Sequence, residues 1–385
     1  MLANPELRSL IAVLKSRQGE TLRLLGRFVR AESPSYDKNA VDSFGRIVAA
    51  EWRKRGAHVR ILKEMERGNH LLVTLWRGPG RPAGRILLLG HLDTVYDKGA
   101  LGATPFKVAR GRAWGPATFD MKGGLALALA AVDALSSAGI RIRKEIACLW
   151  TSDEEIGSFA SLRAIEREAR RSDAVLVLEP SGEPRGALKT ARKGVGEIEL
   201  RAVGRAAHSG LKPEEGINAV HELALQIAKI AKWNQPKRGI GVHVNVASGG
   251  TRSNVIAAEA RAQVDIRVSR ASDMRRLEKR FHSLRPILKG ARLGIRGGFS
   301  RPPMERKMTG ALYKHAVELG ARMGIPISEV SVGGGSDGNF TAAIGIPTLD
   351  GLGAIGENAH SMRENILIRA LAPRAALIAA LLATL

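Results

Sequence analysis

Cysteine and aromatic residues are scarce in this chain of 385 residues, with one cysteine, Cys148, and an aromatic content of 4%. A single cysteine excludes an intrachain disulfide and is compatible with a reducing compartment, so we predict a cytoplasmic protein. Because Cys148 lies in the apolar stretch IACLW, we interpret it as a buried core residue rather than a nucleophile.

The sequence also lacks a hydrophobic run long enough to cross a membrane. Its most apolar stretch, AALIAALLATL near the C-terminus, is much shorter than the roughly 20 residues that a membrane-spanning helix needs. The N-terminal stretch has an amphipathic pattern that carries Glu6, Arg8 and Lys15, unlike the basic and then apolar layout of a secretory signal. We therefore predict that the protein has no membrane partner.

Acidic residues are few relative to basic ones, 37 against 60, which gives a formal net charge of +23. A positive field of this kind attracts anionic substrates, nucleic acid or acidic surfaces. The basic residues are scattered, for example over residues 53–55, 141–144 and 275–280, and no nucleic-acid-binding motif accompanies them. We interpret arginine as the ordinary surface residue here, expect no nucleic-acid partner, and regard attraction of an anionic substrate as a secondary benefit.

The length of the chain favours one large domain with a smaller one beside it. Apolar residues at helical spacing predict helices over residues 5–29 and 38–56. Buried strands then alternate with helices through residues 85–179, which predicts an α/β fold with a large, mostly parallel sheet.

The order of elements changes near residue 193. Over about a hundred residues the pattern is β-α-β-β-α-β, the ferredoxin-like order, and the α/β pattern resumes after it. We therefore predict a domain made of residues 1–192 and 302–385, into which a ferredoxin-like domain of residues 193–301 is inserted.

Histidines and carboxylates follow the predicted buried strands or begin the next helix. The carboxyl ends of strands in an open α/β sheet line the ligand crevice, so we expect these side chains from five distant segments to converge. The set comprises His91, Asp93, Asp120, Asp153, Glu154, Glu155, Glu179 and His360.

Clustered carboxylates raise one another's pKa unless a cation neutralises them. Imidazole and carboxylate ligands without thiolate suit zinc, with cobalt or manganese as alternatives. The candidate ligands are too many for one tetrahedral ion and fit two ions that share a carboxylate, roughly 3.5–4 Å apart, in a site that hydrolyses its substrate. Of the adjacent Glu154 and Glu155, one would bind metal and the other would accept a proton from water.

Six motifs, GHLDTV, FDMKGG, TSDEEIGS, LEPS, AAHSG and NAHS, occur in this order along the chain. In this set the sequence resembles peptidase family M20, the di-zinc hydrolases that include glutamate carboxypeptidase, aminoacylase and acetylornithine deacetylase. HLDTVYDKG, TSDEEIGSFAS and GGGSDGN are most similar to the glutamate carboxypeptidase branch. The resemblance covers nearly the whole chain and implies that the inserted domain forms a homodimer.

The resemblance also implies a ligand set for two zinc ions per subunit. Asp120 would bridge the two ions and would be followed by a cis peptide bond. His91 and Glu179 would complete the shell of one ion, and Glu155 and His360 would complete that of the other.

For the reaction itself, the resemblance makes Glu154 the general base and later the acid. Asp93 would hold the second ring nitrogen of His91. His208, in the inserted domain, would reach the active site of the partner subunit and stabilise the developing oxyanion, and Asn254 would lie near the same oxyanion.

Substrate binding is assigned to an arginine and a glycine-rich turn. Arg301 resembles the arginine that binds the terminal carboxylate of the substrate, with Arg296 and Arg252 as alternatives. Gly334 and Gly335 lie in a turn that either presents backbone N–H groups to a substrate carboxylate or is purely structural.

These observations together predict a di-zinc hydrolase. It would cleave the amide bond of an N-acyl amino acid or a small anionic peptide next to a free C-terminal carboxylate, and would release glutamate. The first alternative keeps the chemistry and makes the protein a deacylase or dipeptidase, like acetylornithine deacetylase, desuccinylase or aminoacylase. The second is a non-catalytic basic binding protein, which the presence of Glu154 beside a full ligand set disfavours.

Overall fold

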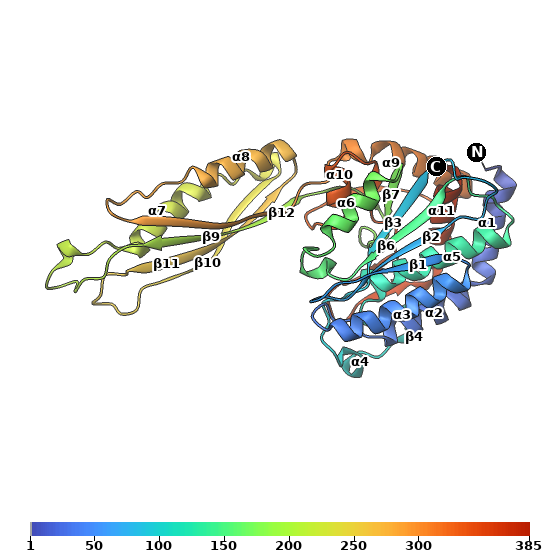
Figure 1. The fold of residues 1–385 in the computed structure, drawn as a ribbon, viewed down its shortest axis with the longest axis horizontal. Coiled ribbons are helices and arrows are strands. Elements are labelled where there is room, and N and C mark those ends of the chain that lie inside the picture. The colour runs from blue at the N-terminus through green and yellow to red at the C-terminus, as the bar shows by residue number, and fades with distance from the viewer. Residues whose placement is uncertain (1) are drawn as a thin grey trace. The chain divides into compact units, whose positions relative to one another are not determined.

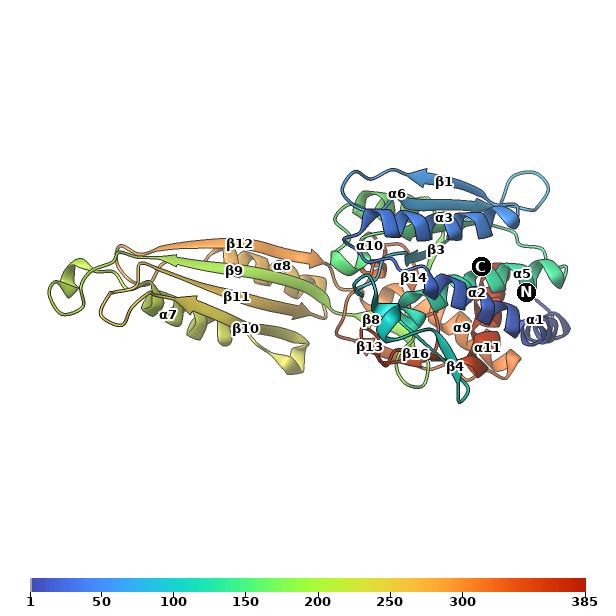
Figure 2. The same ribbon diagram turned by 90° about the horizontal axis from the view of Figure 1, so that it is seen from below.

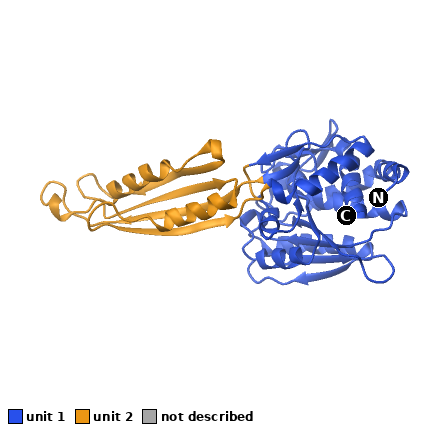
Figure 3. Cartoon of the chain, turned by 90° about the horizontal axis from the view of Figure 1, so that it is seen from above, with its two compact units in different colours: residues 1–191, 306–332, 336–385 blue, residues 192–305, 333–335 orange. Residues whose placement is uncertain are grey.

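The computed structural model describes residues 2–385, which divide into two compact units. The larger unit contains the N-terminal segment up to Ala191 together with Arg306–Val332 and Ser336–Leu385. The smaller unit contains Arg192–Glu305 and residues 333–335 (Figure 3). Within residues 2–385, no helix combines the length and the apolar character that crossing a membrane would require.

A six-stranded sheet in the order β1-β2-β6-β3-β7-β14 forms the centre of the larger unit (Figure 1). Neighbouring strands from β6 to β14 are parallel, whereas β2 runs antiparallel to both β6 and β1. The α/β fold with a mostly parallel sheet is thus confirmed. The strands are β1 (His58–Leu62), β2 (His70–Leu75), β6 (Glu145–Thr151), β3 (Arg85–His91), β7 (Ala174–Val177) and β14 (Thr348–Leu349).

Strand β3 is buried along its whole length because helices cover both faces of the sheet. Its alternate residues pack into different cores, as the pleat of a strand requires. Ile86 and Leu88 belong to the core that includes α5 (Gly123–Ser137) and α11 (Leu371–Thr384). Leu87 and Leu89 belong to the core that includes α6 (Leu162–Arg170). The continuous leucine run in the sequence is therefore the mark of a strand buried on both sides.

The helices of this unit confirm most of the predicted helical segments. The expected single helix over residues 5–29 is wrong, because the chain turns at Arg17, which has non-helical backbone angles, so that two helices each pack against α5. The helices are α1 (Asn4–Ser16), α2 (Gln18–Arg30), α3 (Lys38–Lys54), α4 (Ala100–Ala103), α5 (Gly123–Ser137), α6 (Leu162–Arg170), α9 (Gly310–Met323), α10 (Gly338–Ala343) and α11 (Leu371–Thr384).

Glu51 on α3 is buried and forms ion pairs with Arg27, Lys54 and Arg55. Burial alone would raise the pKa of Glu51, but the hydrogen bonds from these cations lower it to about 2. A carboxylate with a lowered folded-state pKa stabilises the fold above its unfolded pKa, and the contribution disappears as the pH falls through about 2.

We expect Glu51→Gln to lower the free energy of unfolding at pH 7 by about 2 kcal/mol, since water screens the exposed ends of its partners. Its stability should also depend less on pH between about 4.5 and about 2 than that of the wild type. Urea unfolding over this pH range measures both effects. Glu20→Gln, which removes a carboxylate of an exposed pair with Arg17, is the control and should leave the stability unchanged.

Two small sheets in the larger unit were not predicted. Their strands of two to five residues are too short to show a clear alternating pattern. The first has the order β15-β16-β5-β4, and the second pairs β13 with β8. The strands are β4 (Lys107–Ala109), β5 (Arg112–Trp114), β8 (Leu188–Arg192), β13 (Glu329–Val332), β15 (Gly356–Glu357) and β16 (Asn365–Leu367).

The smaller unit is a four-stranded antiparallel sheet in the order β10-β11-β9-β12, with two helices against it (Figure 2). This is the strand order of a ferredoxin-like unit, and its core is separate from those of the larger unit. The elements are β9 (Gly194–Val203), α7 (Ala219–Ala231), β10 (Ile240–Gly249), β11 (Glu259–Val268), α8 (Ala271–His282) and β12 (Arg292–Arg301).

Candidate metal centre

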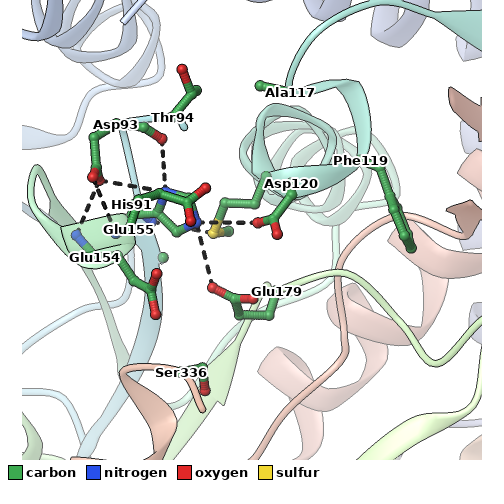
Figure 4. Close-up of polar contacts among 12 residues, drawn as sticks. His91, Asp93, Thr94, Ala117, Phe119, Asp120, Glu154, Glu155, Glu179 and Ser336 are labelled. Carbon is green, nitrogen blue, oxygen red and sulfur yellow. Dashed lines mark hydrogen bonds and ion pairs between the residues drawn. The ribbon is translucent and has the colours of Figure 1, made fainter. Parts of the chain in front are cut away.

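Five of the predicted side chains meet at the carboxyl ends of β3, β6 and β7. His91 is the last residue of β3, Glu155 lies in the turn after β6, and Glu179 follows β7 closely. Asp120 lies in the turn that begins α5, and His360 lies in the loop between β15 and β16. Figure 4 shows the side chains of His91, Asp120 and Glu179 directed toward one another.

Asp120 is shared by two groups of three candidate ligands. Its Oδ1 lies 3.2 Å from Nε2 of His91, and its Oδ2 lies 3.1 Å from Nε2 of His360. Glu179 Oε1 is 3.5 Å from the His91 nitrogen, and Glu155 Oε2 is 3.4 Å from the His360 nitrogen. Within each group the ligand atoms lie within 4.8 Å of one another. One carboxylate thus serves two trios with a different oxygen for each.

The electrostatics of the cluster are those of a cation site. Burial alone would lower the pKa of His91, but Asp120, Asp93 and Glu179 raise it well above its ordinary value. The Asp120 hydrogen bond, with Glu155 next, raises the pKa of His360 to about 11. The carboxylate field that raises these two pKa values would equally favour divalent cations between the same groups.

The residues fit two such ions. Burial raises the pKa of Glu155 to about 7, and its Oε1 is buried with no hydrogen-bond partner among the described residues. A carboxylate oxygen in that position is available to a metal. Each trio provides one imidazole and two carboxylates, the nitrogen and oxygen ligands that zinc accepts, and catalytic zinc sites leave a further position open for water. The arrangement is therefore suited to metal-assisted hydrolysis.

His91 is held by Asp93, mainly through the backbone. Its Nδ1 lies 2.9 Å from the carbonyl oxygen of Asp93 and 3.5 Å from the carboxylate Oδ1. The carboxylate of Asp93 instead accepts hydrogen bonds from the backbone N–H groups of Glu154 and Glu155, each at 3.2 Å, and from the hydroxyl of Ser35. Asp93 thus orients the histidine and also fixes the turn that carries both glutamates.

Glu154 lies in that same turn, directly before Glu155, and is half-buried. Figure 4 shows its carboxylate on the same side of the cluster as Glu179. Ser158 anchors the following residues by donating its hydroxyl to Asp337, at the start of α10. The backbone therefore presents two adjacent glutamates to the cluster from a turn with two anchors.

Two features of the motifs occur in the segments around Asp120, a cis peptide bond and a glycine before His91. The peptide bond between Asp120 and Met121 is cis, which confirms the implied cis bond. The sulfur of Met121 accepts the backbone N–H of His91 at 3.2 Å. A Cβ atom at Gly90 would lie 2.4 Å from the Met121 methyl group, so only glycine leaves room for Met121 before His91.

Sequence reasoning missed Glu364. This buried carboxylate accepts the backbone N–H groups of Phe119 at 2.7 Å, Asp120 at 2.8 Å and Ala117 at 3.2 Å, and the hydroxyl of Tyr96. Burial raises the pKa of Glu364 to about 7. It follows the NAHS motif by only a few residues, but nothing in its local pattern distinguishes it from a surface glutamate. Its contacts fix the segment that presents Asp120.

We expect Glu364→Gln to weaken metal binding about 10- to 100-fold, because an amide has one acceptor oxygen for the N–H groups that the carboxylate now satisfies. Equilibrium dialysis against a metal series measures the change. Glu357→Gln is the matched control, since Glu357 lies on the same hairpin but pairs with Arg112. Equal metal affinity of the two variants would show that Glu364 does not position Asp120.

The residues predicted for oxyanion stabilisation in the partner subunit and for substrate binding belong to the smaller unit. His208 and Asn254 are exposed neighbours there, since the N–H of Ser209 donates to the carbonyl of Asn254. Arg301 ends β12 and is buried, and a Cβ at Gly335 would lie 2.7 Å from its Cδ.

The predicted glycine turn is held by hydrogen bonds from Arg192, which also belongs to the smaller unit. The carbonyl oxygens of Gly334 and Gly335 accept hydrogen bonds from the Arg192 guanidinium at 3.3 and 3.0 Å. The structure thus groups Arg301 and this turn within the smaller unit, and groups the five candidate metal ligands within the larger one.

Several known proteins are similar to this chain in sequence or in fold. The chain is 28% identical over 372 residues to carboxypeptidase G2 of Pseudomonas sp. (strain RS-16), covering 94% of this chain and 88% of that protein. It is 28% identical over 317 residues to succinyl-diaminopimelate desuccinylase of Stenotrophomonas maltophilia, covering 76% and 82%. The fold is similar to that of aminopeptidase PepT from Bacillus cereus, with a TM-score of 0.81 at 22% identity over 95% of this chain and 98% of that one.

Another solved structure with this fold is the dinuclear metal-binding peptidase YXEP of Bacillus subtilis, with a TM-score of 0.72 at 13% identity over 96% of this chain and 98% of that one. Residues 87–384 match the sequence profile of peptidase family M20/M25/M40. This match spans most of the chain and includes every candidate metal ligand. The protein therefore belongs to peptidase family M20/M25/M40 and is a metal-dependent hydrolase.

Proposed function

We propose that the protein is a di-zinc carboxypeptidase-like amidohydrolase that releases glutamate from an N-acyl amino acid or a small anionic peptide. The observation that carries the proposal is the sharing of Asp120. Its two oxygens face His91 and His360, and each histidine also faces one further carboxylate. Two ions held in this way would share Asp120 and be completed by His91 with Glu179 and by Glu155 with His360.

When bound, the two cations would favour ionisation of a water molecule and polarise the scissile carbonyl. Glu154 is the proposed general base. It lies beside a proposed ligand in a turn fixed by Asp93, so its carboxylate can accept the proton of the attacking water. The same group then gives that proton to the leaving nitrogen, which departs as an amine.

The proposed substrate has a free carboxylate next to the scissile amide. Arg301 is the proposed binding group for it, because a planar guanidinium can bind a carboxylate through two parallel hydrogen bonds. Gly335 leaves room for the Arg301 side chain. The similarity to carboxypeptidase G2 over 94% of the chain supports the carboxypeptidase branch, and the excess of basic residues favours an anionic substrate.

Deacylation of N-acyl amino acids, or dipeptide hydrolysis, is the second candidate, since several similar proteins are named succinyl-diaminopimelate desuccinylase. Amine release from matched N-acyl-glutamate and N-acyl-ornithine substrates by the zinc-loaded protein, with and without chelator, separates the two. Chelator-sensitive release of glutamate alone supports the first proposal. Release of ornithine instead supports the second and leaves the metal site in place, and chelator-resistant turnover contradicts both.

We also propose a homodimer formed by the smaller unit, in which His208 completes the active site of the partner subunit. The exposure of His208 and its neighbour Asn254 is compatible with this role. If it is correct, His208→Ala and Glu154→Gln should each be inactive alone, because each removes a residue of every site. A mixed heterodimer would hold one site with both residues intact.

We therefore expect an equal mixture of the two inactive variants, unfolded and refolded together, to recover about one quarter of wild-type activity. Half of the dimers would be mixed, and each would have one working site out of two. The control is an equal mixture of the two variants after each has been refolded separately. It is assayed before the dimers have had time to exchange subunits. No recovery after joint refolding, with heterodimers present by native mass spectrometry, would place His208 and Glu154 in the same subunit's site.

A further inference from the structure

A cavity of about 830 Å³ lies in the larger unit, at the opposite ends of the central strands from the candidate metal centre. Leu75, at the end of β2, and Ile146, at the start of β6, pair with each other and both line it. The neighbouring strand β3 begins beside them and ends at His91, about 20 Å away along a strand of seven residues. The cavity is thus separate from the site proposed for hydrolysis.

Aliphatic side chains, the aliphatic floor, line the cavity together with the indole of Trp76. The indole N–H of Trp76 donates to the carbonyl of Gly80 at 3.0 Å. A Cβ at Gly78 would lie 2.3 Å from the Trp76 ring, so the loop packs closely around the ring and fixes it. The aliphatic lining residues are Leu75, Val132, Leu135, Ile140, Ile142 and Ile146.

Four arginines, Arg77, Arg81, Arg141 and Arg143, also line the cavity, and none of its described lining residues is acidic. The Arg77 guanidinium donates to the backbone carbonyl of Arg55. The side chains of Arg81, Arg141 and Arg143 are exposed and form no ion pair or hydrogen bond with other described residues. These four arginines therefore form a positive group, and the described lining of the cavity holds no carboxylate to balance it.

We propose that this cavity binds a single-chain anionic amphiphile, a fatty carboxylate whose acyl chain lies on the aliphatic floor and whose head group contacts the arginines. An apolar floor beside unpaired guanidinium groups complements both parts of such a molecule. A purely polar anion would leave the floor unused, and a neutral apolar molecule would leave the arginines unmatched. The site is distinct from the metal centre, so its occupant is not the hydrolysed substrate.

Calorimetric titration of the metal-loaded protein with hexanoate, octanoate and decanoate below their micellar concentrations tests this proposal. We expect affinity to rise by up to about fourfold for each added methylene, and decyltrimethylammonium to fail to bind. The double variant Arg81→Glu/Arg141→Glu should bind decanoate at least about tenfold more weakly. The matched variant Arg163→Glu/Arg171→Glu changes the charge equally at exposed positions outside the cavity and should bind like the wild type.

Fluorescence provides a second readout that reports on the cavity itself. Decanoate should change the tryptophan emission of the wild type, and Trp76→Phe should abolish the change while calorimetric binding persists. Equal decanoate affinity in the two arginine double variants would overturn the proposal, because binding at the metal centre would give that result. Co-sedimentation with phosphatidylglycerol vesicles, without binding of free decanoate, would also overturn it in favour of a membrane surface.

Discussion

Glu154→Gln is expected to lower kcat by about 10²- to 10⁴-fold, while the protein still binds its metal ions. Glutamine keeps the shape of the side chain but cannot accept the proton of the attacking water. The backbone N–H of residue 154 would still donate to Asp93, so the turn should keep its conformation. Steady-state kinetics together with metal analysis by inductively coupled plasma mass spectrometry measures both quantities.

The adjacent residue provides the matched control. Glu155→Gln makes the same chemical change one position further along the same turn, where the carboxylate faces His360. This variant should lose metal affinity, whereas Glu154→Gln should lose turnover at full metal content. Full activity of Glu154→Gln, or the same loss of metal in both variants, would remove Glu154 from the role of general base.

Asp120→Ala is expected to have the largest effect of any single change. Because both groups of candidate ligands include Asp120, the substitution should prevent stable binding of either ion and reduce kcat by more than roughly 10⁴-fold. It would also leave His91 and His360 without the carboxylate that both now contact. Metal content after dialysis and residual turnover with excess zinc measure the two consequences.

A variant that lacks a ligand of one group only shows whether the effect of Asp120→Ala arises because both groups share Asp120. His360→Ala removes a ligand of one group only, so it should leave about one ion per chain in the group of His91 and Glu179. If Asp120→Ala and His360→Ala retain the same amount of metal, Asp120 does not bridge two ions. Circular dichroism of both variants confirms that any metal loss does not follow from unfolding.

The features that the sequence predicted well are those with strong local patterns. The leucine run before His91 indicated a buried strand. Glu155 and Glu179 follow buried strands in the sequence, and this predicted their position at the carboxyl ends of a parallel sheet. Chain topology alone brings such residues together, because parallel strands present their carboxyl ends on the same side.

The features that were missed depend on contacts between distant segments. Glu364 looks like any glutamate in a loop, and only the folded hairpin brings it to the backbone of Asp120. The break between α1 and α2 at Arg17 interrupts a continuous amphipathic pattern, since both helices bury one face. The carbonyl of Asp93, rather than its side chain, makes the shorter contact to His91, which residue identity cannot indicate.

The position of two ions on either side of Asp120 is the central claim, and anomalous X-ray diffraction from crystals of the zinc-loaded protein at the zinc absorption edge tests it most directly. We predict two peaks roughly 3.5–4 Å apart, one beside His91 and Glu179 and the other beside Glu155 and His360, with the Asp120 carboxylate between them. A single peak, or peaks that Asp120 does not contact, would contradict the proposed dinuclear hydrolase.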